Sequence, residues 1–144
     1  MTQIELTASL EDYLEAFYEI TQEKNGAKAV DIAKKLNVQR SSVTEALKNL
    51  SSKGLVNYGR YEVISLTEKG VEVAQKVIEK HETLYDFLTT ILGVEKNEAS
   101  KFACKIEHNI SDEVLNRLLC FIKYYKQNNN HCLSDFQDFY KSKK

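Results

Sequence analysis

The sequence predicts a mainly α-helical protein with a small β wing, in which an N-terminal winged helix-turn-helix domain precedes an α-helical domain. The 144-residue chain has five glycines and no proline, a composition that favours long uninterrupted helices. Two short helical patterns joined by a tight turn and followed by two short strand patterns are typical of a winged helix. Helical periodicity then continues almost to the last residue. We therefore expect one domain over residues 1–72 and a second over residues 73–144.

The first predicted helix, over residues 9–23, carries an acidic face. Its apolar stripe consists of Leu10, Tyr13, Leu14, Phe17 and Ile20. Asp12, Glu15 and Glu19 therefore lie on the opposite side. Residues 1–23 hold six acidic and no basic side chains, so this face repels itself unless positive charge approaches. A metal ion, the basic neighbouring helix or solvating water would each relieve that repulsion.

The segment that follows is basic and has helix-turn-helix spacing. Residues 24–60 contain eight basic and two acidic side chains, a balance typical of a polyanion-binding surface. A helix over residues 29–36 leads into a turn in which Asn37 tolerates a left-handed backbone. Ser41 is expected to N-cap a second helix that ends near Gly54. The wing is expected to consist of strands over residues 55–58 and 62–66.

The second helix of a winged helix enters the major groove of DNA with its N-terminal residues closest to the base edges. The side chains expected at the DNA are Gln39, Arg40, Ser41, Ser42 and Thr44 near the bases, Lys48 at a phosphate, and Arg60 at the wing tip. A winged helix can also serve protein contact alone. The excess of positive charge in this block favours DNA.

A long helix is predicted after the wing. It begins with Thr67 as its N-cap and ends at Leu92, before Gly93. His81 lies in the middle of its apolar stripe. A single histidine on an apolar face is more often a hydrogen-bonded core residue than a metal ligand, but it would also supply an inward-facing nitrogen to a metal site.

The next helix, over residues 97–109, carries three kinds of metal ligand. Cys104, Glu107 and His108 fall on one face of a regular helix. A thiolate, a carboxylate and an imidazole together suit borderline divalent metals such as Fe(II), Co(II) and Zn(II). The alternative for this run, taken alone, is a buried cysteine beside a solvated glutamate and histidine.

The last part of the chain indicates a partner subunit. Ser111 is expected to cap a helix with many apolar positions over residues 114–125, and residues 136–140 form a short terminal helix after a linker at residues 128–130. A small domain with so many apolar positions leaves apolar surface for another chain to cover. The helical domain is therefore expected to dimerise.

The cysteine count and the N-terminus predict a cytoplasmic protein. Three cysteines are an odd number in a chain without a secretion signal, so free or metal-bound thiols are expected rather than a disulfide framework. No apolar run approaches the ~20 residues of a membrane span.

The chain resembles the diphtheria-toxin-repressor-like metalloregulators, a family that includes the manganese transport regulator and the iron-dependent repressors. The matching stretches are residues 10–15 (LEDYLE), 39–44 (QRSSVT), 66–70 (LTEKG), 80–88 (KHETLYDFL), 103–108 (ACKIEH) and 111–114 (SDEV). The resemblance covers roughly residues 6–125. It implies a homodimeric repressor of metal-uptake genes, with Mn(II) or Fe(II) as co-repressor for operator DNA binding. The regulatory metal site that it implies consists of Asp12, Glu15, His81, Cys104, Glu107 and His108.

Some positions depart from one branch of that family or the other. Asp12 is similar to the manganese-type members, whereas Cys104 is similar to the iron-type members. Tyr85 and Ser100 replace ligands of an ancillary site in iron-type members. The chain also ends without the small third domain of the longer members. The ancillary site in its usual form is therefore not expected, the number of metal ions per subunit stays open, and the sensor site is expected to be usable by both Fe(II) and Mn(II).

Two other classes of function compete with this interpretation. In the first, a metal-independent winged-helix regulator senses thiol oxidation at Cys104. In the second, a small metal-dependent hydrolase uses Glu107 as its base, but no glycine-rich substrate loop or second catalytic cluster supports an enzyme.

Overall fold

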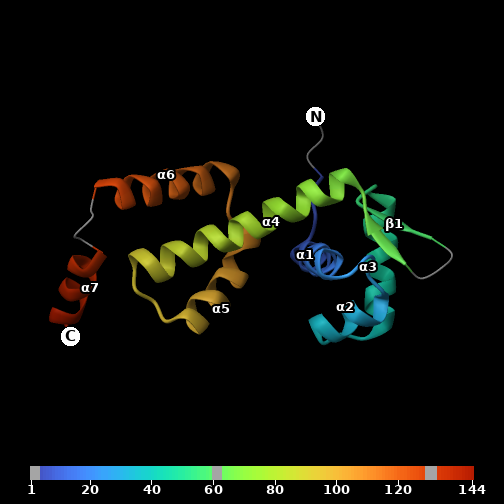
Figure 1. Cartoon of the computed structure of the whole chain (residues 1–144), viewed down its shortest axis with the longest axis horizontal. Helices are drawn as coiled ribbons and strands as arrows, with labels where there is room; N and C mark the ends of the chain where they lie inside the picture. Colours follow the sequence, from blue (N-terminus) through green and yellow to red (C-terminus); the bar gives the residue numbers. More distant parts are fainter. Residues whose placement is uncertain (1–3, 60–62, 129–132) are drawn as a thin grey trace. The chain divides into compact units, whose positions relative to one another are not determined.

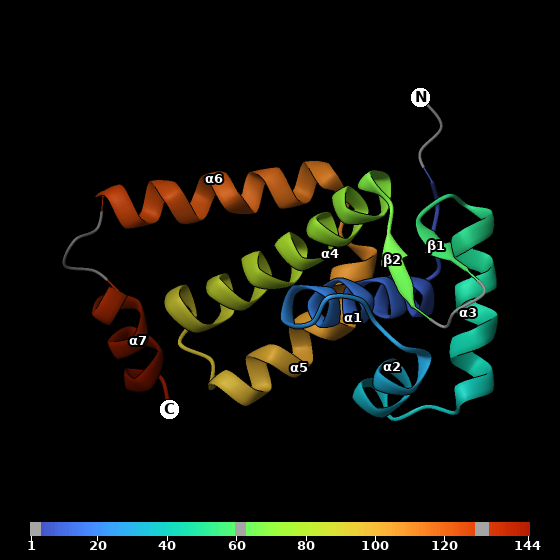
Figure 2. The same cartoon turned by 45° about the vertical axis from the view of Figure 1, so that its right-hand side comes forward.

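The computed structural model describes residues 4–59, 63–128 and 133–144, which form two compact units (Figures 1 and 2). The first unit is Met1–Val77 and the second is Ile78–Lys144. Helix α4, Glu68–Asp86, runs from one unit into the other without a break. The boundary that we predict after residue 72 lies inside this helix and stays a prediction.

The first unit is the predicted winged helix. Its helices are α1 (Ala8–Glu23), α2 (Ala29–Leu36) and α3 (Arg40–Ser52). The fully buried side chains of its core include Leu14 and Phe17 from α1, Ile32 from α2, and Leu47 and Leu50 from α3. Residues of the predicted apolar stripes therefore meet in one core, which fixes α3 against α1 and α2.

The turn between α2 and α3 is tighter than predicted. Asn37 adopts the left-handed conformation with φ 54°, as expected. The backbone N–H of Val38 then closes α2 on the carbonyl of Ala33 at 3.0 Å, so few residues are left for the turn. Gln39 becomes the N-cap and Arg40 starts α3. The prediction of Ser41 as the N-cap was therefore wrong.

The wing is a two-stranded antiparallel sheet with one additional bridge. Strand β1 (Val56–Tyr58) pairs with β2 (Ile64–Leu66) in the register Val56 to Leu66. Ala27, just before α2, bridges Ile64 through hydrogen bonds of 2.9 and 3.2 Å. The sequence does not reveal this third segment because a single bridging residue has no periodicity.

Thr67 and Gly70 join the wing to α4. As predicted, Thr67 is the N-cap: its hydroxyl oxygen accepts from the backbone N–H of Gly70 at 3.0 Å, and the hydroxyl donates to the carbonyl of Gly54 at 2.7 Å. A Cβ atom at Gly70 would lie 1.9 Å from the carbonyl oxygen of Leu55. Only glycine therefore allows the first turn of α4 to approach this backbone.

The second unit is helical. After α4 come a π-helical turn η1 (Phe87–Ile91), α5 (Lys96–Ile106), a 3₁₀ turn η2 (Glu107–Asn109), α6 (Asp112–Asn128) and α7 (Leu133–Ser142). Gly93, with φ 71°, ends the long helix as predicted. Ser111 accepts from the N–H of Val114 at 3.3 Å, the expected cap of α6. No helix in the described parts of the chain is long and apolar enough to cross a membrane.

Candidate metal centre and nucleic-acid interface

The run from Cys104 to His108 is divided between two kinds of helix. The α-helix ends at Ile106, and Glu107 and His108 belong to the 3₁₀ turn η2. The prediction of one regular helix to about residue 109 was therefore wrong. Because α6 starts at Asp112, the chain must leave α5 early, and a tighter last turn is a common way for a helix to end.

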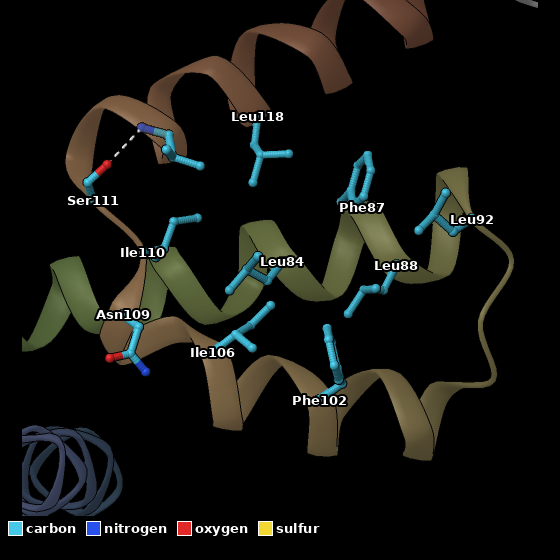
Figure 3. Close-up of a pocket in the computed structure, with 11 residues that line it drawn as sticks. Leu84, Phe87, Leu88, Leu92, Phe102, Ile106, Asn109, Ile110, Ser111 and Leu118 are labelled. Carbon is cyan, nitrogen blue, oxygen red and sulfur yellow. Dashed lines mark hydrogen bonds between the residues drawn. The ribbon is translucent and has the colours of Figure 1, made fainter.

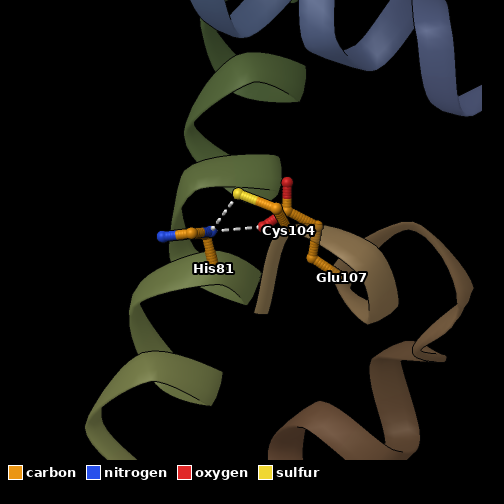
Figure 4. A group of neighbouring side chains, drawn as sticks. All are labelled: His81, Cys104 and Glu107. Atoms are coloured by element: carbon orange, nitrogen blue, oxygen red, sulfur yellow. Dashed lines mark hydrogen bonds and ion pairs between the residues drawn. The ribbon is translucent and has the colours of Figure 1, made fainter. Parts of the chain in front are cut away.

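The candidate ligands of the second unit nevertheless lie together. Nδ1 of His81, on α4, is 2.5 Å from Oε2 of Glu107 and 3.7 Å from Sγ of Cys104. Figure 4 shows the thiol and the carboxylate directed toward the imidazole. One ligand atom from each of the three residues lies within 4.8 Å of the other two. Helix α4, helix α5 and the turn η2 thus bring these donors to one point.

Glu107 links the two histidines. Its side chain is only 2% exposed, and Oε1 lies 3.5 Å from Nε2 of His108 while Oε2 contacts His81. A buried carboxylate is costly unless cations or hydrogen-bond donors surround it. Two imidazoles fill this role, so Glu107 is the centre of the cluster. The predicted metal site contained both His81 and Glu107, but the direct contact between their side chains was not predicted.

The donor set fits a divalent transition metal. It combines a thiol, two imidazoles and a buried carboxylate, and the side chain of Cys104 is exposed to solvent. Thiolate and imidazole suit Zn(II), Fe(II) and Co(II), and carboxylate extends the range toward Mn(II). The arrangement can therefore hold a metal, with the ligands already close to one another.

Asp12 and Glu15 belong to the first unit, where both lie on α1. Asp12 is exposed and Glu15 is half-buried. Their part in the same metal site as the ligands of the second unit stays a prediction.

The acidic face of α1 also meets the basic helix beside it. Lys35 on α2 pairs with Glu19 at 2.6 Å. This hydrogen bond raises the pKa of Lys35 above its usual value despite partial burial, and the charges of Glu19, Glu23 and Glu15 add to the effect. A neighbouring cation thus relieves part of the repulsion on this face.

Five of the seven predicted DNA-contacting residues lie at the start of α3. The other two are Lys48, further along α3, and Arg60, which we predict at the wing tip. Gln39, Arg40, Ser41 and Ser42 are exposed, as is Lys48 further along the helix. Thr44 is half-buried, and its hydroxyl donates to the carbonyl of Arg40 at 3.1 Å. Arg60 lies outside the described residues. The exposed start of α3 therefore has the polar and basic side chains that a major-groove contact requires.

Lys80 makes contacts close to the candidate metal centre that we did not predict. It precedes His81 on α4, and its Nζ donates to the carbonyl of Ile110 at 3.1 Å and lies 3.8 Å from Oδ1 of Asp112. The sequence contains many lysines at helix surfaces, and nothing in its pattern distinguishes this one.

Two family models together match most of the chain. Residues 5–64 match the N-terminal DNA-binding domain of the iron-dependent repressors, and residues 67–134 match their metal-binding and dimerisation domain. The chain belongs to the iron-dependent repressor family. It is a metal-dependent transcriptional regulator with a DNA-binding and a dimerisation domain, and not an enzyme. The predicted fold class and family are confirmed.

Individual relatives agree with this assignment. An uncharacterised HTH-type transcriptional regulator of Methanocaldococcus jannaschii is 45% identical over 122 residues, covering 84% of this chain and 98% of the relative. The HTH-type regulator MntR of Shouchella clausii is 37% identical over 122 residues, covering 85% of each chain.

Solved structures of similar fold contain several metals. A manganese-dependent transcriptional repressor in complex with manganese is 26% identical with a TM-score of 0.71, covering 80% of this chain and 53% of the other. The regulator ScaR with bound Zn²⁺ is 30% identical with a TM-score of 0.70, covering 80% and 54%. This chain thus spans about half the length of these solved regulators.

Proposed function

We propose that this regulator is a homodimeric repressor of metal-uptake genes that binds operator DNA when Mn(II) or Fe(II) occupies its sensor site. The observation that carries the proposal is the cluster of His81, Cys104 and Glu107 around one point, with His108 against the same carboxylate. This cluster lies within the part of the chain that matches a metal-binding and dimerisation domain.

The proposed sensor site has ligands from both units. His81, Cys104, Glu107 and His108 provide the part from the second unit, and Asp12 and Glu15 complete it from α1. A bound divalent cation supplies the positive charge that the thiolate and the carboxylates share. Asp12 and Glu15 repel each other less once they face it, and α1 becomes tied to the second unit.

The position of α1 matters for DNA because α1 packs against α2 and α3 in the first unit. When its carboxylates engage the sensor site, the start of α3 is held in place relative to the dimerisation domain. Two recognition helices of a dimer must meet successive major-groove faces roughly 34 Å apart. A small hinge change between the units therefore alters the affinity for DNA.

An apolar cavity in the second unit supports dimerisation. Its volume is about 590 Å³, and it is lined by Leu84, Phe87, Leu88, Leu92, Phe102, Ile106, Asn109, Ile110, Ser111, Val114 and Leu118 (Figure 3). Phe102 and Val114 are each 49% exposed in the single chain. A second copy that covers this cavity would bury apolar surface that one chain leaves in water.

The donor set supports use of both Mn(II) and Fe(II). The hard carboxylates of Asp12 and Glu15 suit Mn(II), whereas the thiolate of Cys104 shifts the preference toward Fe(II), Co(II) or Zn(II). Zn(II) binds such donors more tightly than either, so availability of the metal and the geometry of the site determine which ion acts.

The second candidate is a metal-independent regulator that senses oxidation at Cys104. The observation in its favour is that the thiol is exposed and lies 3.7 Å from an imidazole nitrogen, a setting that favours the reactive thiolate. DNA binding that is equal in metal and in chelator, and that loses its peroxide sensitivity in a Cys104→Ser variant, would establish this candidate. Cys120→Ser, which changes another exposed free cysteine on α6, is the matched control.

The experiment that tests the proposed function is a DNA retardation assay. A duplex is first selected from a random pool by the purified protein, separately with Mn(II) and with chelator. Retardation is then compared in Mn(II), Fe(II), Zn(II) and chelator for the native chain, His81→Ala and the control Glu82→Ala, which changes an exposed neighbour on α4. We expect metal-dependent retardation that His81→Ala removes and Glu82→Ala keeps. Equal retardation in chelator and metal would overturn the proposal.

A further inference from the structure

We propose that Lys80 is a positioning residue of the metal centre: it holds the 3₁₀ turn that carries Glu107 and His108 against helix α4, which carries His81, and thereby sets metal affinity. The proposal rests on the proposed function, because it concerns the same site. Lys80 itself does not coordinate the metal.

Lys80 contacts the segment that leaves the 3₁₀ turn. Its Nζ donates to the carbonyl of Ile110, the residue that follows η2, at 3.1 Å. The same Nζ lies 3.8 Å from the carboxylate of Asp112, the first residue of α6. The Lys80 side chain is only 16% exposed, so this ammonium group is held in place rather than extended into solvent.

Lys80 and His81 hold the two ends of one short segment. His81 contacts Glu107 at the start of η2, and Lys80 contacts Ile110 and Asp112 just after its end. Adjacent residues of a helix point in directions about 100° apart, so the two side chains fix the segment at two separate points. The distance between α4 and the turn is therefore set before a metal binds.

This arrangement determines how far a bound metal must itself bring helix α4 and the turn together. The imidazole of His81 and the carboxylate of Glu107 come from positions 26 residues apart, and a metal ion can use both only if their elements stay close. Groups that orient ligands in this way commonly change metal affinity by about 10–100-fold when they are removed. Lys80→Met should therefore weaken metal binding although every ligand remains.

The positive charge of Lys80 acts in the opposite direction, because an ammonium group near a metal site repels the cation. Removal of that charge alone would raise metal affinity. Lys105, exposed on α5 between Cys104 and Glu107, provides a matched control for charge, because its side chain makes no hydrogen bond or ion pair to the turn in the described part of the chain. Lys80→Arg keeps the charge and can donate to the same oxygens.

The test is a Co(II) titration of the full-length protein followed by absorption spectroscopy, because the thiolate-to-cobalt band reports Cys104 and the d–d bands report coordination geometry. Mn(II) binding is measured in parallel by electron paramagnetic resonance. For Lys80→Met we expect a Kd at least about tenfold higher and altered d–d bands, and for Lys105→Met a Kd no higher than that of the native chain. Lys80→Arg should recover most of the lost affinity, and circular dichroism verifies that each variant is folded.

The outcomes separate the two proposals. If the native chain binds no Co(II), or its thiolate band survives in Cys104→Ser, the proposed sensor site fails and the role of Lys80 is overturned with it. If the native chain binds as expected and Lys80→Met has an unchanged or lower Kd with the same d–d bands, only the positioning role is overturned. If Lys80→Met does not fold, Lys80→Arg becomes the test, and a Kd at least about tenfold above the native value overturns the positioning role.

Discussion

The imidazole of His81 and the carboxylate of Glu107 lie 2.5 Å apart although 26 residues separate them in the chain. His81 belongs to the long helix α4, and Glu107 to the 3₁₀ turn after α5. The contact therefore joins α4 to the 3₁₀ turn that also carries His108 and that directly follows α5, the helix of Cys104. It lies within the part of the chain that matches a metal-binding and dimerisation domain, which contains four of the six ligands of the proposed sensor site.

Glu107→Gln should reduce metal affinity strongly. Glutamine has nearly the same shape and can still hydrogen-bond the histidines, but it lacks the negative charge that the metal requires. We expect the Kd for Mn(II), measured by isothermal titration calorimetry, to rise by about 100-fold or more. Glu98→Gln changes an exposed glutamate on α5, the helix before the turn, and should leave the Kd unchanged. Equal affinities of native and Glu107→Gln proteins would show that the metal binds elsewhere.

Arg40→Ala, at the start of α3, and Lys48→Ala, further along the same helix, should each weaken DNA binding. A phosphate contact contributes to the salt dependence of affinity, so loss of one lowers the slope of log K against log salt by about one. Fluorescence anisotropy over a range of salt concentrations measures both quantities. Lys101→Ala removes an exposed positive charge on α5 and serves as control. Slopes that stay at the native value would place the DNA on another surface.

Phe102→Asp should weaken the dimer. The Phe102 side chain lines the apolar cavity and is 49% exposed in the single chain, so the aspartate is tolerated in the monomer but not beneath a second copy. We expect the dimer dissociation constant, measured by sedimentation equilibrium, to rise at least about tenfold. Tyr58→Asp alters a similarly exposed aromatic residue in the wing and should not affect it. A native dissociation constant for Phe102→Asp would rule out this cavity as the interface.

Gly70→Ala should destabilise the first unit. Its new methyl group would lie 1.9 Å from the carbonyl oxygen of Leu55, so α4 or the wing must shift. We expect a loss of about 2 kcal/mol or more in the free energy of unfolding, measured with urea. At Gly59 a Cβ would meet nothing within 4 Å, so Gly59→Ala should have little effect. A Gly70→Ala protein of native stability would mean that the approach of α4 to Leu55 is looser than described.

Asp86 should stabilise the protein at neutral pH and cease to do so in acid. Burial acts to raise its pKa, but hydrogen bonds from Lys126 and Thr90 and the charge of Lys126 outweigh burial, so the pKa lies below its usual value. A lowered pKa stabilises the fold above the unfolded value of about 3.9, and this stabilisation is lost as the pH falls through the folded pKa.

The Asp86 effect can be measured by urea unfolding of the native chain and Asp86→Asn at pH 7 and near pH 3. We expect a difference of less than about 1 kcal/mol at pH 7, because the side chain is 36% exposed, and a smaller one in acid. Lys126→Met should reproduce the loss. A difference that does not depend on pH would contradict the cause assigned to the shifted pKa.

The sequence predicted those features that depend on local chemistry. The left-handed Asn37, the capping Thr67 and the helix end at Gly93 each follow from the preferences of one residue for one backbone conformation. The apolar stripe of α1 was predictable because a period of 3.6 residues determines which side chains enter the core.

The features that the sequence did not reveal depend on tertiary structure. Gln39 is the N-cap in place of Ser41, because the N–H of Val38 still bonds to α2 and the turn is short. The 3₁₀ turn at Glu107 lies between the end of α5 and the start of α6. The contact of Lys80 with Ile110 joins segments 30 residues apart. No local pattern in the sequence specifies such long-range pairings. The types of the candidate ligands could therefore be predicted, but the contacts that hold those ligands in place could not.

The most direct test of metal control is the reciprocal effect of DNA on metal binding. If metal tightens DNA binding by some factor, DNA must tighten metal binding by the same factor. Mn(II) affinity is measured by electron paramagnetic resonance with and without a saturating amount of the selected duplex. We expect the duplex to lower the Kd for Mn(II) by the factor by which Mn(II) lowers the Kd for the duplex. An identical Mn(II) affinity in both conditions would contradict the claim that the metal is a co-repressor.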